Sequence, residues 1–148
     1  MAGCALIITL LMGGAAYVPA NDCSLEIVIY NLDNRRLWTY AIGMTSLSVT
    51  WHSPSGEPDR LMYRRGLTAG ETKKLDRFLA RYPFGRLEKY YVNERINGNT
   101  GTVYRIRINK NIKDVFVFYA RPEQVLELNR FINRLLPRQF HLWDEPSS

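Results

Sequence analysis

Histidine and cysteine are scarce in this chain of 148 residues, which has two of each. Zinc sites with the usual ligand spacing need more of these residues, so we expect no metal and no cofactor. The strings that mark phosphate-binding loops, nucleophile elbows and zinc proteases are also missing. The common catalytic signatures are therefore excluded, and a non-enzymatic protein is the expectation, although a missing motif does not disprove activity.

Hydrophobic runs long enough to cross a bilayer, which takes about 20 residues, are missing too. A short apolar run extends from Ala5 to Met12, and small residues follow it. Val18 and Ala20 fit the positions that signal peptidase requires, so residues 1–20 are predicted to be a signal peptide, with cleavage after Ala16 as a second possibility. No Lys or Arg precedes the run. An uncleaved N-terminal anchor and a buried strand therefore remain as alternatives to export to the periplasm or beyond the cell.

Cleavage after Ala20 would leave Cys23 as the single cysteine, which excludes an intramolecular disulfide from the processed chain. The residues before Cys23 do not form a lipid-attachment box. Those before Cys4 do, but without an apolar segment upstream, so lipidation there would need a longer gene product. The mature chain must therefore rely on an apolar core.

Acidic residues are outnumbered: 14 Asp and Glu face 20 Lys and Arg, a net charge of +6, and the first twenty residues carry no charge. This balance suits an acidic partner, such as an acidic component of the cell envelope, but it also serves solubility alone. With 46% hydrophobic and 23% charged residues, the composition is that of one globular domain. We place this domain at residues 21–137.

Alternating apolar and polar residues predict strands at residues 25–30, 37–42, 46–52 and 61–64. Thr68 and Glu71 then form a capping box, which starts a helix that ends at Pro83. The apolar stripe of this helix is Leu75, Phe78, Leu79 and Tyr82; its other face carries Lys73, Lys74, Arg77 and Arg81, partly offset by Asp76. Such a basic face is usually solvated.

The second half repeats the order of strands and then a helix. Strands are predicted at residues 87–92, 103–108 and 114–119, the last one central in the sheet, with an Asn97-Gly98 turn before the second. A helix begins at Pro122 and ends at Pro137, and residues 138–148 form a tail, pinned by Phe140, Leu142 and Trp143. The fold class is therefore α+β: an antiparallel sheet with two amphipathic helices packed on one face, in the order strands, helix, strands, helix.

Arginine in strand contexts is the informative polar feature. The candidate binding residues are Arg64, Arg65, Tyr104, Arg105 and Arg107, with Tyr63, Tyr90 and Tyr91 interleaved. Protein interfaces favour both residue types. If Arg105 and Arg107 project from the face opposite the helices, that face is a basic and aromatic platform; the alternative is a sheet face that is merely solvated. Nucleic acid is not expected as the partner.

The string from Leu67 to Leu75, the Asn97-Gly98 hairpin and the closing helix from Pro122 to Leu136 resemble those of small exported bacterial proteins of the kind classed as domains of unknown function. The resemblance covers the order of elements over residues 25–137. It implies a bacterial, exported protein and carries no known chemistry with it.

We therefore expect an exported binding protein of the bacterial envelope or secreted space that acts through its sheet face on an unknown protein or an acidic envelope component. One alternative is an inhibitor or immunity-type protein of an envelope enzyme. Another is a small hydrolase or thiol enzyme that uses Cys23 or His52, with Asp33 as the group that orients the histidine.

Overall fold

The computed structural model describes residues 19–31, 33–96 and 98–144. The predicted signal peptide therefore lies almost entirely outside the described residues, as does Asn97. The elements are β1 (Cys23–Asn31), β2 (Arg36–Gly43), β3 (Ser46–Trp51), β4 (Arg60–Gly66), α1 (Ala69–Arg81), η1 (Phe84–Arg86), β5 (Tyr90–Val92), β6 (Thr100–Ile108), β7 (Asn111–Phe118), α2 (Glu123–Asn133) and η2 (Arg138–Phe140). This order confirms the predicted α+β class.

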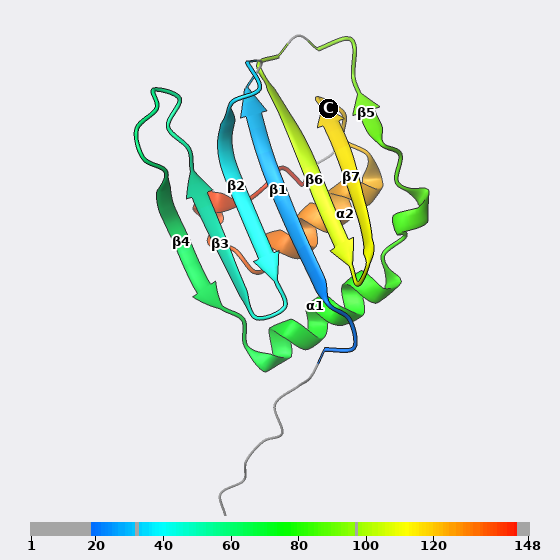
Figure 1. Ribbon diagram of the computed structural model, residues 1–148. Helices are drawn as coiled ribbons and strands as arrows, with labels where there is room; N and C mark the ends of the chain where they lie inside the picture. Colours follow the sequence, from blue (N-terminus) through cyan, green and yellow to red (C-terminus); the bar gives the residue numbers. More distant parts are fainter. Residues whose placement is uncertain (1–18, 32, 97, 145–148) are drawn as a thin grey trace, which may run out of the picture.

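All seven strands belong to one sheet, in the order β4-β3-β2-β1-β6-β7-β5 (Figure 1). Every neighbouring pair is antiparallel except β5 and β7, which run parallel. The prediction of an antiparallel sheet is therefore wrong at this one edge. Strand β5 does not pair with β6, because β7 lies between them, so the link through Gly98 is not a tight hairpin. Strand β7 is also not central; β1 occupies the middle of the sheet.

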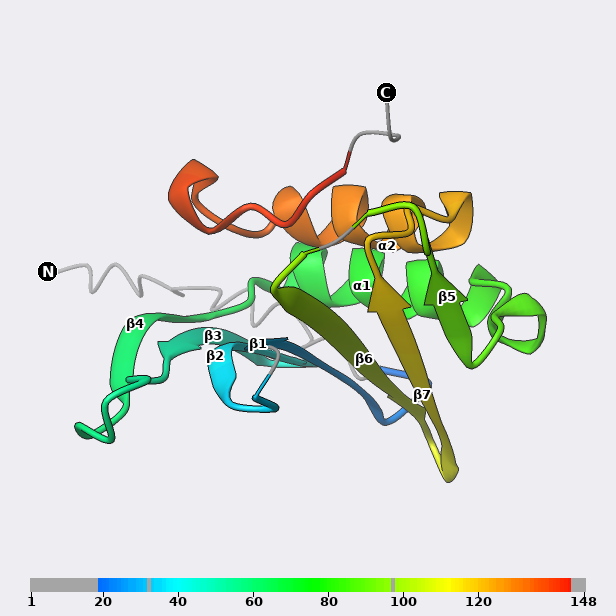
Figure 2. The same cartoon turned by 90° about the horizontal axis from the view of Figure 1, so that it is seen from above.

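Both helices cover the same face of the sheet, as predicted (Figure 2). Alternate side chains of the inner strands point toward the helices and form the core, among them Ile27, Val49 and Val115, which have no exposed surface. The strands β4 and β7 bend away from the helices at the two sides of the sheet (Figure 2). The opposite face, which we call the open face, is therefore concave.

Helix α1 begins as the sequence predicts, because the Thr68 hydroxyl accepts a hydrogen bond from the Glu71 amide and the Glu71 side chain accepts one from the Thr68 amide. Its apolar side packs on the sheet, and the Thr72 hydroxyl donates to the carbonyl oxygen of Met44 at 2.7 Å. Asp76 is buried on this side. The two acidic residues of α1 therefore both face the body of the protein, away from the exposed basic face.

Helix α2 binds the segment that follows it through two buried asparagines. The Asn133 side chain bonds both the amide and the carbonyl oxygen of Leu142, and Asn129 donates to the carbonyl oxygen of Trp143. Phe140 and Leu142 are buried, and Trp143 packs against the core. Residues 138–144, predicted to be a pinned tail, are therefore part of the packed domain.

Candidate functional site: the open sheet face

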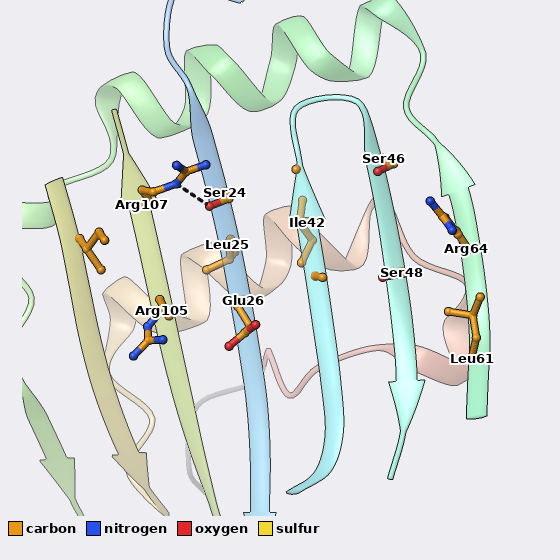
Figure 3. A pocket seen from close by; sticks show the side chains of 13 residues that line it. Ser24, Leu25, Glu26, Ile42, Ser46, Ser48, Leu61, Arg64, Arg105 and Arg107 are labelled. Carbon is orange, nitrogen blue, oxygen red and sulfur yellow. Dashed lines mark hydrogen bonds between the residues drawn. The ribbon is translucent and has the colours of Figure 1, made fainter. Parts of the chain in front are cut away.

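A trough runs across the open face between the outer strand β4 and the β6–β7 pair (Figure 3). Its volume is about 480 Å³. Small residues dominate its floor, which is formed by β1, β2 and β3, and longer side chains border it at both sides. The floor is Ser24, Glu26, Ala41, Gly43, Ser46 and Ser48; one border is Leu61 and Arg64, and the other is Arg105, Arg107 and Ile112.

Two arginines of β6 line one border of the trough. Strand alternation points Arg105 and Arg107 to the open face, whereas Tyr104 and Ile106, which alternate with them, enter the core. Arg107 donates to the Ser24 hydroxyl at 3.1 Å (Figure 3). Its guanidinium lies 3.4 Å from the Asp22 carboxylate. The serine is uncharged and the contact with the carboxylate is long, so the charge of Arg107 is only partly neutralised.

Arg105 forms a tighter pair with Asp114 of β7, with two hydrogen bonds of 2.8 Å each. This pairing raises the pKa of Arg105 and lowers the pKa of Asp114. A second hollow of about 420 Å³ begins on the other side of Arg105 and is lined by Tyr30, Val103, Phe116 and Phe118, among others. Arg105 therefore separates a small-residue trough from an aromatic hollow on the same face.

Arg64 lines the opposite border, on β4, and makes no hydrogen bond or ion pair with any residue that the structure describes. Three strands separate it from Arg107 in the sheet order. At about 4.8 Å per strand, the two backbones are roughly 19 Å apart. The trough thus has a guanidinium on each side and a floor of mostly short side chains between them.

Two of the five predicted binding residues are not on this face. Tyr104 is buried in the core, where its hydroxyl donates to Asn129 Oδ1 at 3.0 Å. Arg65 points to the helix side and pairs with Glu71 at 2.7 and 2.8 Å. The reason is strand alternation: Arg64 and Arg65, like Tyr104 and Arg105, are sequence neighbours and must point to opposite faces.

The aromatic half of the predicted platform is also wrong for most of its members. Tyr63 and Tyr91 pack against the core, and only Tyr90 lies on the open face, stacked on Phe116 at a centroid distance of 5.1 Å. Sequence reasoning missed Tyr30, Phe116 and Phe118 as open-face aromatics. The alternation of β7 contains the signal, because Val115 and Val117 are the core residues there and leave both phenylalanines outside.

A Cys23–His52 pair cannot form. Cys23 begins β1, whereas His52 follows Trp51, which aligns through Trp38 with Ile29 near the other end of β1. At about 3.3 Å per residue, the run from Cys23 to Ile29 covers roughly 20 Å. Burial and the nearby carboxylates of Asp76 and Asp22 raise the pKa of Cys23 to about 11, so the thiol stays protonated and unreactive at neutral pH. Asp33 is not the partner of His52 either.

His52 instead stands between a hydroxyl and a carboxylate. Its Nε2 lies 2.7 Å from the Thr39 hydroxyl, and its Nδ1 lies 2.9 Å from Asp59 Oδ2. Thr39 comes from β2 and Asp59 from the loop before β4, so only the folded sheet brings them together. The order hydroxyl, imidazole, carboxylate is that of a nucleophile, its base and the group that orients the base.

No protein-family model matches the chain, and no curated protein matches it significantly. Within the described residues, no helix has the length and apolar composition of a membrane span. In the same part of the chain, no three His, Cys, Asp or Glu side chains gather in a way that would hold a metal ion.

Proposed function

We propose that this is an exported binding protein whose trough receives an acidic segment of a partner protein. The single observation that carries the proposal is Arg64, a guanidinium at the border of a hollow with no counter-ion among the described residues. An arginine in that position is available to a carboxylate from outside, which it binds through a planar, two-pronged set of donors.

The shape of the trough favours a rod-like occupant. An α-helix with its side chains is about 10 to 12 Å across, which is narrower than the roughly 19 Å between the backbones of the bordering strands. The serine and alanine side chains of the floor are short and Gly43 has none, so such a helix can approach the sheet closely. Leu61 and Ile112, which are 58% and 64% exposed, supply apolar contact at the two borders.

The charges that line the trough favour an acidic partner. Arg64, Arg105 and Arg107 outnumber the single carboxylate of the trough lining, Glu26. Because Arg105 is already paired with Asp114, Arg64 and Arg107 remain for a ligand. An acidic helix with carboxylates on two sides would form ion pairs with both arginines. The 3.4 Å contact between Asp22 and Arg107 would then be replaced by a contact with the ligand.

The test is capture of a partner from envelope extract with the double variant Arg64→Glu and Arg107→Glu. The matched control is Arg36→Glu with Arg138→Glu, which changes the net charge equally at exposed positions outside the trough. We expect the trough variant to lose the partner and the control to keep it. A partner retained undiminished by the trough variant would exclude this face.

An inhibitor or immunity-type protein would use the same face, so the identity of the captured partner separates these two functions. Capture of an enzyme whose activity falls upon binding favours the inhibitor. Capture of a protein without such an effect favours a structural or assembly role.

A second candidate function is hydrolysis of an ester, favoured by the Thr39, His52 and Asp59 arrangement. In the tautomer that carries its proton on Nδ1, facing Asp59, the His52 ring presents a lone pair at Nε2 to the Thr39 hydroxyl. Thr39 Oγ1 would attack the ester carbonyl carbon while its proton passes to Nε2 and then to the departing alcohol. Water would then cleave the threonyl ester in the same way and restore the hydroxyl.

This candidate has a sharp control, because Thr50 lies directly opposite Thr39 on the neighbouring strand. Any hydrolysis of an activated phenyl ester above background should disappear in Thr39→Val and persist in Thr50→Val. Equal rates for the parent chain and Thr39→Val would eliminate the candidate and leave His52 with the role of fixing the loop before β4.

A further inference from the structure

The exposed face of α1 is basic along its whole length. Lys73, Arg77 and Arg81 recur at every fourth residue and Lys74 adjoins them, so all four side chains lie on the solvent side of the helix. None of the four makes an ion pair with a carboxylate in the described part of the chain. We call these four residues the basic stripe.

The acidic residues of the same helix lie on its other side. Glu71 is bound by Arg65 on the sheet side, and Asp76 is buried beneath the helix. Asp22, which follows the residues bound to Asp76, forms its ion pair with Arg107 on the open face. The stripe is therefore a concentrated patch of one charge, whereas the other exposed helix, α2, pairs its Arg130 with Glu123 at 2.7 Å.

The N-terminal end of the described chain is fastened to the same helix. The Ala20 amide donates to Asp76 Oδ2 at 3.1 Å, and the Asn21 side chain donates to Asp76 Oδ1 at 3.0 Å. The turn between β6 and β7, which contains the exposed Lys110, lies at the same end of the sheet as α1 (Figure 1).

We infer that the basic stripe docks the protein on an anionic phospholipid surface. Its four basic side chains, which have no carboxylate partner among the described residues, complement the negative charge of the headgroups. The apolar side of α1 is occupied by the core, so the contact is electrostatic rather than an insertion into the acyl region. Each basic residue near such a surface strengthens binding about fivefold, and salt weakens it.

This inference does not depend on the trough. Helix α1 lies on the face of the sheet opposite the open face (Figure 2). A protein docked through α1 therefore leaves the trough open to a partner, and either proposal can fail without the other.

The test is sedimentation of the full chain with two kinds of vesicle, phosphatidylcholine alone and phosphatidylcholine with 30% phosphatidylglycerol. The stripe variant replaces Lys73, Lys74, Arg77 and Arg81 with glutamine, which keeps helix propensity. The control variant replaces four other exposed basic residues, Arg36, Lys89, Arg95 and Arg138, with glutamine, so both variants have the same net charge. Circular dichroism establishes that each variant is folded.

We expect stronger binding to the anionic vesicles than to the neutral ones, a fall of more than about tenfold in the stripe variant, and less than about threefold in the control. Salt at 0.5 M should remove the difference between vesicle types. If both variants lose vesicle binding equally, net charge rather than the basic stripe causes the binding, and the proposal is overturned. Equal binding to neutral and anionic vesicles would show that charge does not drive the binding and would overturn the proposal. Stripe-dependent binding to a DNA duplex without vesicle binding would overturn the choice of lipid.

Discussion

The guanidinium of Arg65 donates two hydrogen bonds, of 2.7 and 2.8 Å, to the carboxylate of Glu71. This pair connects the end of β4 to the first turn of α1. The same guanidinium donates to the carbonyl oxygen of Leu135 at 2.9 Å, just beyond α2. Three elements from separate parts of the chain thus meet at one ion pair. Both side chains are only about a quarter exposed, which limits screening by water.

The ion pair between Arg65 and Glu71 makes the free energy of unfolding depend on pH. Hydrogen bonds from Arg65 and the Thr68 amide lower the pKa of Glu71 from 4.5 to about 2. Because the folded pKa is the lower one, the stabilisation is complete above pH 4.5 and disappears as the pH falls to 2. Glu71→Gln should lower the free energy of unfolding by about 1 to 2 kcal/mol at pH 7 and by almost nothing at pH 2. Urea unfolding at both pH values measures this.

The matched control for the acid prediction is Glu57→Gln, which removes an exposed carboxylate that lies 3.8 Å from Arg60. Its effect should stay within about 0.5 kcal/mol at either pH. A Glu71→Gln variant with an undiminished difference in stability between pH 7 and pH 2 would show that other carboxylates cause the acid sensitivity.

Tyr104→Phe should destabilise the core by about 1 to 3 kcal/mol, because Asn129 Oδ1 would lose its donor in a site without access to water. Thermal unfolding of the variant measures the loss. Tyr90→Phe is the control, since Tyr90 is more than half exposed, and it should change stability by less than about 0.5 kcal/mol. Similar shifts in both variants would contradict the buried role of this hydroxyl.

Cys23 should react slowly with iodoacetamide at pH 8, because its pKa of about 11 leaves little thiolate and its side chain is buried. In a Cys4→Ser background, in which Cys23 is the only thiol, we expect labelling at least about tenfold slower in the folded protein than in 8 M urea. Mass spectrometry follows the reaction. Equal rates would show that Cys23 is accessible and would reopen thiol chemistry for this protein.

Export should remove the first twenty residues. Intact mass of the protein from its host is expected to give a chain that starts at Asn21, or at Tyr17 if the second site is used. A chain that starts at Asn21 keeps the hydrogen bond from the Asn21 side chain to Asp76. Recovery of a soluble chain with Met1 intact would overturn both processing and export.

Local patterns determined much of this protein. The capping box of Thr68 and Glu71 depends on atoms three residues apart, so sequence alone places the start of α1. Alternation along a strand gives Arg105 and Arg107 one face and Tyr104 the other, so the pattern of β6 already indicates that Tyr104 is a core residue. The apolar stripes of both helices likewise followed from their spacing.

Only the tertiary structure decided which long-range neighbours complete each site. Strand order placed Arg64 across the trough from Arg107, and it joined Thr39 to His52 through the pairing of β2 with β3. The parallel edge strand β5 and the burial of Asp76 beneath α1 also depend on how distant segments pack. Helix starts and strand faces are set by contacts a few residues apart, which a sequence displays directly. Strand order and counter-ions are set by the packing of the whole chain, which the sequence does not display.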